Sequence, residues 1–151
     1  VHDFVPAALG QMGARIVFHK VAIKPGKPIL FAQLPNGVPY FGLPGNPAST
    51  AAGVRFFLSP LLRALSGRPP EAPRFAPVKT RVAGARGGLR LFVRARMEEG
   101  TAGGESQIDV PAGQLSFMAR PFTCTNGWGV VPENREGLEA GEGMAFFPDG
   151  G

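Results

Sequence analysis

The chain has 151 residues, of which 44% are hydrophobic, a content that is typical of globular proteins and excludes a fully disordered chain. Its net charge is +5 and is confined to residues 1–63, which hold six Lys or Arg and one acid, whereas residues 64–151 hold ten of each sign. This distribution favours a small anionic ligand, or acidic groups elsewhere in the protein, over nucleic acid.

The scarcity of cysteine and histidine excludes further kinds of site. Cys124 is the single cysteine, so no internal disulfide can form, and with two histidines no Cys/His zinc site can be assembled. We expect Cys124 to serve in packing, in a reducing, cytoplasmic environment. No apolar run reaches the roughly eighteen residues of a membrane span, and no signal-peptide pattern is present, so no membrane association is predicted.

The first elements are a helix and a strand. Apolar spacing near 3.6 residues predicts a helix from Asp3 to Met12, with Asp3 as its N-cap. Weak alternation then predicts a strand over Arg15–Ile23. On such a strand Lys20 and Lys24 would lie on the same face.

A hairpin and a long helix follow. Strands are predicted at Ile29–Gln33 and Val38–Phe41, joined by a turn at Pro35–Gly37. A helix is predicted over residues 47–65, kinked or split at Pro60. The apolar stripe predicted for this helix consists of Val54, Phe57, Leu58, Leu61, Leu62 and Leu65.

The stretch that joins the hairpin to this helix is suited to binding an anion. Its two prolines stiffen the backbone, and its glycines let the backbone approach a ligand closely. Asn46 is a preferred N-cap, and the first helical turn then offers N–H groups, two hydroxyls and the positive end of the helix dipole. The alternative is a capped turn without a ligand. The residues concerned are Gly42, Pro44, Gly45, Asn46, Pro47, Ser49 and Thr50.

A second stiff segment, Lys24–Pro28, places two cations between prolines and a glycine. Because a rigid backbone reduces the entropy lost on holding an anion, Lys24 and Lys27 are candidate oxyanion ligands. The alternative is two solvated surface lysines. Both stiff segments suit the same phosphate-rich ligand, so we expect them to lie together at one site.

The rest of the chain predicts a small β domain. Proline-rich residues 67–73 predict an extended linker, and the short strands after it predict a barrel or sandwich. In the second strand Arg94 shares a face with Arg90 and Arg96, where pattern alone predicts solvation. The predicted strands are Ala76–Val82, Leu89–Met97, Gln107–Val110, Gly129–Val131 and Gly143–Phe147.

Two segments resemble the molybdopterin molybdenumtransferase family, which includes MoeA and the gephyrin E domain. They are Lys20-Val21-Ala22-Ile23-Lys24-Pro25-Gly26-Lys27-Pro28 and Phe41-Gly42-Leu43-Pro44-Gly45-Asn46-Pro47-Ala48-Ser49, in the family's order and at its separation. The resemblance extends more weakly over the whole chain. It implies a C-terminal piece of a longer protein, with missing N-terminal domains.

The resemblance implies an α/β plus all-β fold. In it, the C-terminal half of a MogA-like α/β molybdopterin-binding domain is followed by a small β-barrel domain. We predict that the first domain covers residues 1–66, the linker residues 67–75 and the barrel residues 76–151. The family works as a homodimer, so a homodimer is expected.

The resemblance also implies the roles of individual residues. Lys24, Lys27, Arg94 and Ser116 would bind molybdate, and Lys20 and Pro28 would line the same site. The phosphate end of adenylylated molybdopterin would lie on Gly42, Pro44, Gly45, Asn46, Pro47 and Ser49. Asp3 would contribute to a Mg²⁺ site together with carboxylates from the missing part, because a single acid cannot form one.

The chain departs from the family pattern in one segment. Where the family usually shows a QGSH-like string, this chain has Gly113-Gln114-Leu115-Ser116-Phe117, so that the histidine is replaced and a leucine is inserted. Further along, we expect Trp128 to be a core residue and not a ligand contact.

The implied reaction inserts molybdenum from molybdate into adenylylated molybdopterin and releases AMP. We expect little or no turnover from this chain alone, since it lacks the family's glycine-rich loop and most of its carboxylates. The main alternative is a non-enzymatic scaffold or ligand-binding module of the gephyrin type. A nucleic-acid-binding barrel and a nucleotide-processing amidase that shares only the α/β domain are further alternatives.

Overall fold

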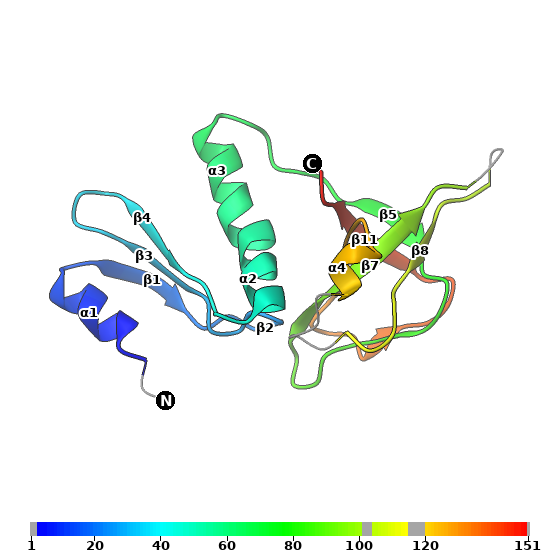
Figure 1. The fold of residues 1–151 in the computed structure, drawn as a ribbon, viewed down its shortest axis with the longest axis horizontal. Helices are drawn as coiled ribbons and strands as arrows, with labels where there is room; N and C mark the ends of the chain where they lie inside the picture. The colour runs from blue at the N-terminus through cyan, green and yellow to red at the C-terminus, as the bar shows by residue number, and fades with distance from the viewer. Residues whose placement is uncertain (1–2, 101–103, 115–119, 151) are drawn as a thin grey trace.

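The computed structural model describes residues 3–100, 104–114 and 120–150 (Figure 1). The chain begins with helix α1 (Val5–Gln11), which packs Leu9 against the neighbouring sheet. Phe4 occupies the N-cap position, and the Asp3 carboxylate accepts the Val5 N–H at 3.1 Å. The prediction that Asp3 is the N-cap is therefore wrong by one residue, although Asp3 does take one of the helix's first N–H groups.

Strand β1 (Arg15–His19) is shorter than predicted. It ends because Lys20 has a φ of +66°, which turns the backbone out of the extended conformation. A separate strand, β2 (Ile23–Lys24), follows after this turn and joins a different sheet. The prediction of one strand with Lys20 and Lys24 on a common face is therefore wrong.

Strands β3 (Leu30–Gln33) and β4 (Pro39–Gly42) form the predicted hairpin. In its turn the Asn36 side chain accepts the Val38 N–H at 3.2 Å, a local bond that asparagine commonly makes in turns. Together with β1 the hairpin forms a three-stranded antiparallel sheet in the order β1-β3-β4.

The long helix consists of α2 (Pro47–Gly53), a π-helical segment η1 (Val54–Leu58) and α3 (Ser59–Leu65). A π-helical turn adds a residue to the helix and therefore rotates the residues that follow it. For this reason only part of the predicted stripe faces inward: Val54, Leu62 and Leu65 are exposed, whereas Phe57 packs inward as predicted. The other inward-packing side chains of the helix are Ala51, Ala52 and Phe56.

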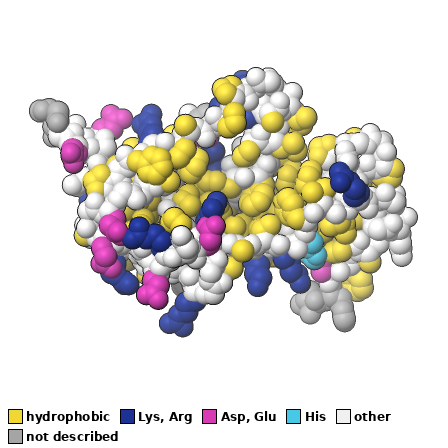
Figure 2. Space-filling model, turned by 180° about the vertical axis from the view of Figure 1, so that it is seen from behind, with side chains coloured by type: hydrophobic (Ala, Val, Ile, Leu, Met, Phe, Trp, Pro, Cys, Tyr) yellow, Lys and Arg dark blue, Asp and Glu magenta, His cyan; other side chains and the backbone are white. Residues whose placement is uncertain are grey.

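The helix stands between the three-stranded sheet and the second half of the molecule (Figure 1). Phe56 stacks on Phe92 with ring centroids 3.9 Å apart and meets Trp128 edge-on at 5.9 Å. These rings belong to one core cluster with Ile23 and Ile29. Hydrophobic side chains thus join the two halves, and Figure 2 shows further hydrophobic side chains across the middle of the opposite face.

The second half is a small barrel of short strands. Its elements are β5 (Arg74–Pro77), β6 (Val82–Ala83), β7 (Arg90–Glu98), β8 (Gln107–Asp109), α4 (Arg120–Thr123), β9 (Gly127–Val131), β10 (Gly137–Leu138) and β11 (Gly143–Pro148). The predicted strand Ala76–Val82 is therefore two strands, β5 and β6, separated by a turn. The order in the main sheet is β2-β7-β9-β11-β5, with β8 paired to β7, and β6 pairs with β10.

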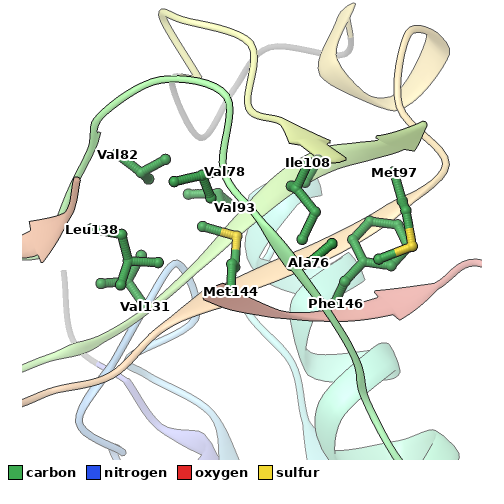
Figure 3. Close-up of a cluster of buried hydrophobic side chains, with 11 residues drawn as sticks. Ala76, Val78, Val82, Val93, Met97, Ile108, Val131, Leu138, Met144 and Phe146 are labelled. Atoms are coloured by element: carbon green, nitrogen blue, oxygen red, sulfur yellow. The ribbon is translucent and has the colours of Figure 1, made fainter. Parts of the chain in front are cut away.

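The barrel encloses its own hydrophobic core (Figure 3). Phe146, Met144, Ile108 and Val131 are almost fully buried there. Gly129 allows this packing, because a Cβ at its position would lie 2.2 Å from the Met144 sulfur. The barrel therefore has an interior that is separate from the aromatic cluster under the helix.

Strand β2 connects the two halves through the backbone. It pairs in parallel with β7, with Ile23 opposite Arg90 and Lys24 opposite Leu91. The predicted domain boundaries stay a prediction, but this pairing shows that the first 66 residues contribute a strand to the barrel's sheet. Among the described helices, none combines the length and the apolar character needed to cross a membrane.

Candidate functional site

A cavity of about 470 Å³ lies where the two halves of the molecule meet. Its walls come from the segment after β2, the start of α2, strand β7, strand β9 and helix α4. The described lining residues are Ile23, Lys24, Pro25, Gly26, Lys27, Pro28, Ala48, Ser49, Leu89, Leu91, Phe92, Val93, Arg94, Gln114, Pro121, Phe122 and Trp128.

One wall is the segment Lys24–Pro28, here called the cationic loop. Gly26 is buried in it with a φ of +107°, a conformation that glycine adopts without strain. The backbone of the loop is held by hydrogen bonds from Ile29 N–H to the Gly26 carbonyl and from Val21 N–H to the Lys27 carbonyl. A fixed backbone therefore presents the two lysines to the cavity.

Lys24 and Lys27 are exposed cations that line this cavity. Neither of them forms an ion pair with any described residue. Their positive charges are therefore available to an anionic ligand.

The start of α2 forms a second wall, through Ala48 and the buried Ser49. As predicted, Asn46 is the N-cap, and its side-chain oxygen accepts the Ser49 N–H at 3.4 Å. The Thr50 hydroxyl donates to the carbonyls of Pro44 and Asn46, which closes the turn. The cap thus uses one of the N–H groups that we expected a ligand to bind.

Most of the residues predicted to bind the pterin phosphate end shape the backbone near the cavity but do not line it. Gly42 pairs with Leu30 in the hairpin, and a Cβ on Gly42 would lie 3.3 Å from the Leu30 Cβ. Of the predicted set, Ser49 is among the described lining residues of the cavity. The members outside that lining are Gly42, Pro44, Gly45, Asn46 and Pro47.

Arg94 of β7 lines the same cavity, but its charge is compensated. Its side chain is only 4% exposed, whereas pattern alone predicted solvation. Both terminal nitrogens donate to the Asp149 carboxylate at 2.6 Å, and Nε donates to the Thr125 hydroxyl at 2.9 Å. The rings of Phe122 and Trp128 lie 5.0 and 5.1 Å from the guanidinium carbon.

Gln114 is a site residue that sequence reasoning did not select. Its side-chain oxygen accepts the Arg94 N–H at 2.8 Å, and its amide nitrogen donates to the Arg94 carbonyl at 2.6 Å. The same nitrogen donates to the Pro111 carbonyl at 3.1 Å. The Gln114 amide therefore bonds to β7 as a neighbouring strand would, and the QGSH-like string was the one signal that pointed to it.

Four further predictions concern residues in or near the site. Ser116 lies outside the described residues. Lys20 is exposed and is not among the described residues that line the cavity. Trp128 is 3% exposed, which confirms its core position, although one part of it also lines the cavity. Cys124 is exposed, so the expectation that it serves in packing is wrong.

Asp3 lies next to His19, with 3.7 Å between a carboxylate oxygen and His19 Nε2. No group of three or more potential metal ligands exists among the described residues. Because Mg²⁺ prefers several oxygen ligands, Asp3 and its described neighbours do not by themselves fit this ion.

The cavity combines apolar and aromatic walls with cations at one side. Leu89, Leu91, Phe92 and Phe122 supply apolar surface, and the cationic loop supplies charge. This arrangement suits a ligand that has a flat organic part and an oxyanion or phosphate group.

Comparison with known proteins gives two matching family models. Residues 1–64 match the family described as "Probable molybdopterin binding domain", and residues 76–148 match the "MoeA C-terminal region (domain IV)". The two matches are consecutive and together cover most of the chain.

Curated relatives agree with these matches. A molybdopterin molybdenumtransferase from Synechococcus elongatus is 38% identical over 93% of this chain and 34% of its own length. The corresponding protein from Haemophilus influenzae is 30% identical over 97% of this chain and 36% of its own length. The chain therefore spans about a third of the length of these relatives.

The structure is also similar to a crystal structure of a molybdopterin biosynthesis MoeA protein from Pyrococcus horikosii. The TM-score is 0.76 at 26% sequence identity, over 97% of this chain and 34% of the other. This likeness confirms the predicted fold class, an α/β part followed by a small β-barrel. The chain belongs to the MoeA family, with a molybdopterin-binding domain that is followed by the MoeA C-terminal region.

Proposed function

We propose that the chain acts in molybdenum cofactor biosynthesis. The protein that contains it would insert molybdenum from molybdate into adenylylated molybdopterin and release AMP. One observation carries this proposal: Lys24, Lys27 and Arg94, which come from the two halves of the molecule, line a single cavity. Both relatives are named as transferases, and this favours the enzymatic proposal over a scaffold of the gephyrin type.

In this proposal the cationic loop binds the molybdate dianion. Two ammonium groups without ion-pair partners among the described residues would attract a doubly charged anion, and the closed backbone of the loop would limit the entropy lost on binding. Arg94 and Ser116 would complete the oxyanion site, as the family resemblance implies.

The organic part of the substrate would lie against the apolar walls formed by Leu89, Phe92 and Phe122. The start of α2, at Ala48 and Ser49, would face its phosphate end, since the first N–H groups of a helix attract negative charge. These residues would bind and orient two anions and would exclude water from between them.

Asp3 and its described neighbours do not by themselves provide the oxygen ligands of a Mg²⁺ site. Further carboxylates would have to come from other parts of the protein. We also propose a homodimer in the cytoplasm, as the resemblance implies. Sedimentation equilibrium of the purified protein measures its mass in solution.

The proposal is tested by calorimetric titration of the chain with molybdate. Changing Lys24 or Lys27 to alanine should weaken binding at least about tenfold, since each change removes a charge next to the anion. Lys79→Ala is the matched control, because Lys79 is paired with Glu98 and is not among the described lining residues. Equal affinity for the wild-type chain and Lys27→Ala would overturn the proposed site.

Turnover is a separate question. We expect little or no molybdenum insertion by this chain alone, because it spans only about a third of the length of the transferases that it matches. An assay for AMP release from adenylylated molybdopterin checks this expectation. Full activity of the isolated chain would contradict it.

A further inference from the structure

The charge of Arg94 is compensated by a carboxylate that lies far away in the sequence. Both oxygens of Asp149 accept from the terminal nitrogens of Arg94 at 2.6 Å. The Arg94 side chain is 4% exposed, whereas the Asp149 side chain is 46% exposed. The Asp149 backbone N–H donates to the Asn126 carbonyl at 3.0 Å, so its main chain is fixed to the end of the barrel.

The cavity therefore contains two kinds of cation. Lys24 and Lys27 have no ion-pair partner among the described residues, but Arg94 already holds an anionic group. We propose that Asp149 sets the oxyanion affinity of the cavity by competing, as an internal carboxylate, for the Arg94 guanidinium. This inference rests on the function proposed above and adds a residue that determines how tightly the oxyanion is held.

The geometry explains why the carboxylate, and not the arginine, would give way. Nε of Arg94 is bonded to Thr125, and the rings of Phe122 and Trp128 flank the guanidinium. These contacts fix the plane of the donor group. The half-exposed Asp149 side chain can exchange its two hydrogen bonds to Arg94 for hydrogen bonds to water, because water already reaches it. The buried guanidinium would have no water to replace its partners, so it would lose more free energy by moving away.

An oxyanion would use the same donors. A guanidinium presents its N–H groups as a planar fork that matches two oxygens of a carboxylate or of a tetrahedral anion. While Asp149 occupies the fork, Arg94 adds almost no net charge to the cavity. Binding of the oxyanion to Arg94 must therefore displace the carboxylate, and this lowers the apparent affinity.

The test is titration of the chain with molybdate, in wild-type form and as Asp149→Asn. We expect about tenfold tighter binding by the variant, which corresponds to about 1.4 kcal/mol. Asp149→Glu keeps the charge and should keep the wild-type affinity. Glu139→Gln is the matched control, because it removes one negative charge from an exposed ion pair with Arg81.

A second readout separates competition from a merely structural role. Asp149→Asn leaves the buried guanidinium uncompensated, so the thermal midpoint should fall in the absence of ligand. Saturating molybdate should then raise the midpoint of the variant more than that of the wild-type chain, because the anion takes the place of the carboxylate. If Asp149 only supported the fold, its replacement by asparagine would lower the thermal midpoint and weaken molybdate binding together.

The possible outcomes separate the two proposals. If Asp149→Asn binds both molybdate and sulfate no more tightly than the wild-type chain does, the role of Asp149 is overturned, while the proposed function stays intact as long as the wild-type chain binds molybdate through Lys27. Tighter binding of sulfate but not molybdate by the variant would support the role of Asp149 and count against the proposed function. If neither form binds any oxyanion at millimolar concentration, both proposals are wrong.

Discussion

Ile23 of β2 lies opposite Arg90 of β7 in a parallel pair, and the Arg90 N–H donates to the Ala22 carbonyl at 2.9 Å. The cationic loop begins one residue after Ile23, and Arg94 lies four residues after Arg90 on the same strand. Backbone hydrogen bonds therefore set the separation between the loop and the arginine. The cations of the cavity are held by pairing of strands and not only by contacts between side chains.

The first prediction concerns the glycine of the cationic loop. A Cβ at Gly26 would lie 3.2 Å from an Ile23 methyl and 3.3 Å from an Ile29 methyl, at a φ of +107° that other residues rarely adopt. Gly26→Ala should lower the free energy of unfolding by about 1–3 kcal/mol. Urea denaturation followed by tryptophan fluorescence measures the change.

Gly45→Ala is the control for this prediction. Apart from its two chain neighbours, no described residue has an atom within 4 Å of a Cβ built at Gly45, and its φ is not in the left-handed region. Its stability should stay within about 0.5 kcal/mol of wild type. An equal loss in both variants would show that the packing around Gly26 is not the cause.

Features fixed by neighbouring residues could be predicted from the sequence. Asn46 followed by Pro47 predicts a cap and a first helical residue because both act within one turn, and the structure shows this cap. The hairpin at residues 30–42 was predicted to within one residue at each end, because its turn residues act locally.

Features that depend on distant residues could not be predicted. Asp149 lies 55 residues from Arg94, and no local pattern indicates that the two form a pair. The pairing of β2 with β7 likewise joins segments about 67 residues apart. Because no local pattern shows this pairing, the sequence predicted one strand that ran through Lys20 to Ile23. The π-helical segment changed the buried face of the helix, and this segment has no marker in the sequence except the nearby Pro60.

The second prediction concerns the contact between the helix and the barrel. Phe56 stacks on Phe92, and its ring lies 5.9 Å from Trp128 and 5.4 Å from Phe147 in edge-on arrangements. Phe56→Ala should lower the free energy of unfolding by about 3–5 kcal/mol, since it leaves a cavity among aromatic rings. Denaturation followed by circular dichroism measures this loss.

Phe75→Ala is the matched control, because the Phe75 side chain is 71% exposed on β5. We expect a change of less than about 1 kcal/mol. If Phe56→Ala were as harmless as Phe75→Ala, the stacked cluster would not be what holds the helix against the barrel.

The third prediction concerns Gln114. Its side chain makes three hydrogen bonds to backbone groups of Arg94 and Pro111. Gln114→Ala leaves these groups without their partners and should lower the free energy of unfolding by about 1–3 kcal/mol. Hydrogen exchange of the Arg94 amide should become faster, and this can be followed by NMR.

Gln107→Ala, at an exposed position of β8, is the control for Gln114. It should leave both the stability and the exchange of the Arg94 amide close to wild type. Unchanged exchange at Arg94 in Gln114→Ala would contradict the strand-like role of the Gln114 amide.

The last prediction concerns pH. Hydrogen bonds from Arg90 lower the pKa of Glu133, and those from Lys79 and Arg135 lower the pKa values of Glu98 and Glu142 in the same way. A carboxylate with a lowered pKa in the folded state stabilises the fold above its unfolded pKa, and this contribution is lost as pH falls through the folded pKa. Stability should therefore decrease between about pH 5 and pH 3.

NMR titration of the glutamate carboxyl carbons checks this. The midpoint of Glu133 should lie below the ordinary glutamate value, and Arg90→Ala should return it towards that value, because the bidentate hydrogen bonds at 2.9 and 3.1 Å are removed. All three pairs are exposed, so 0.5 M salt should reduce the shifts by screening. A midpoint for Glu133 that is ordinary in the wild-type chain and unmoved in Arg90→Ala would show that this ion pair does not form in solution.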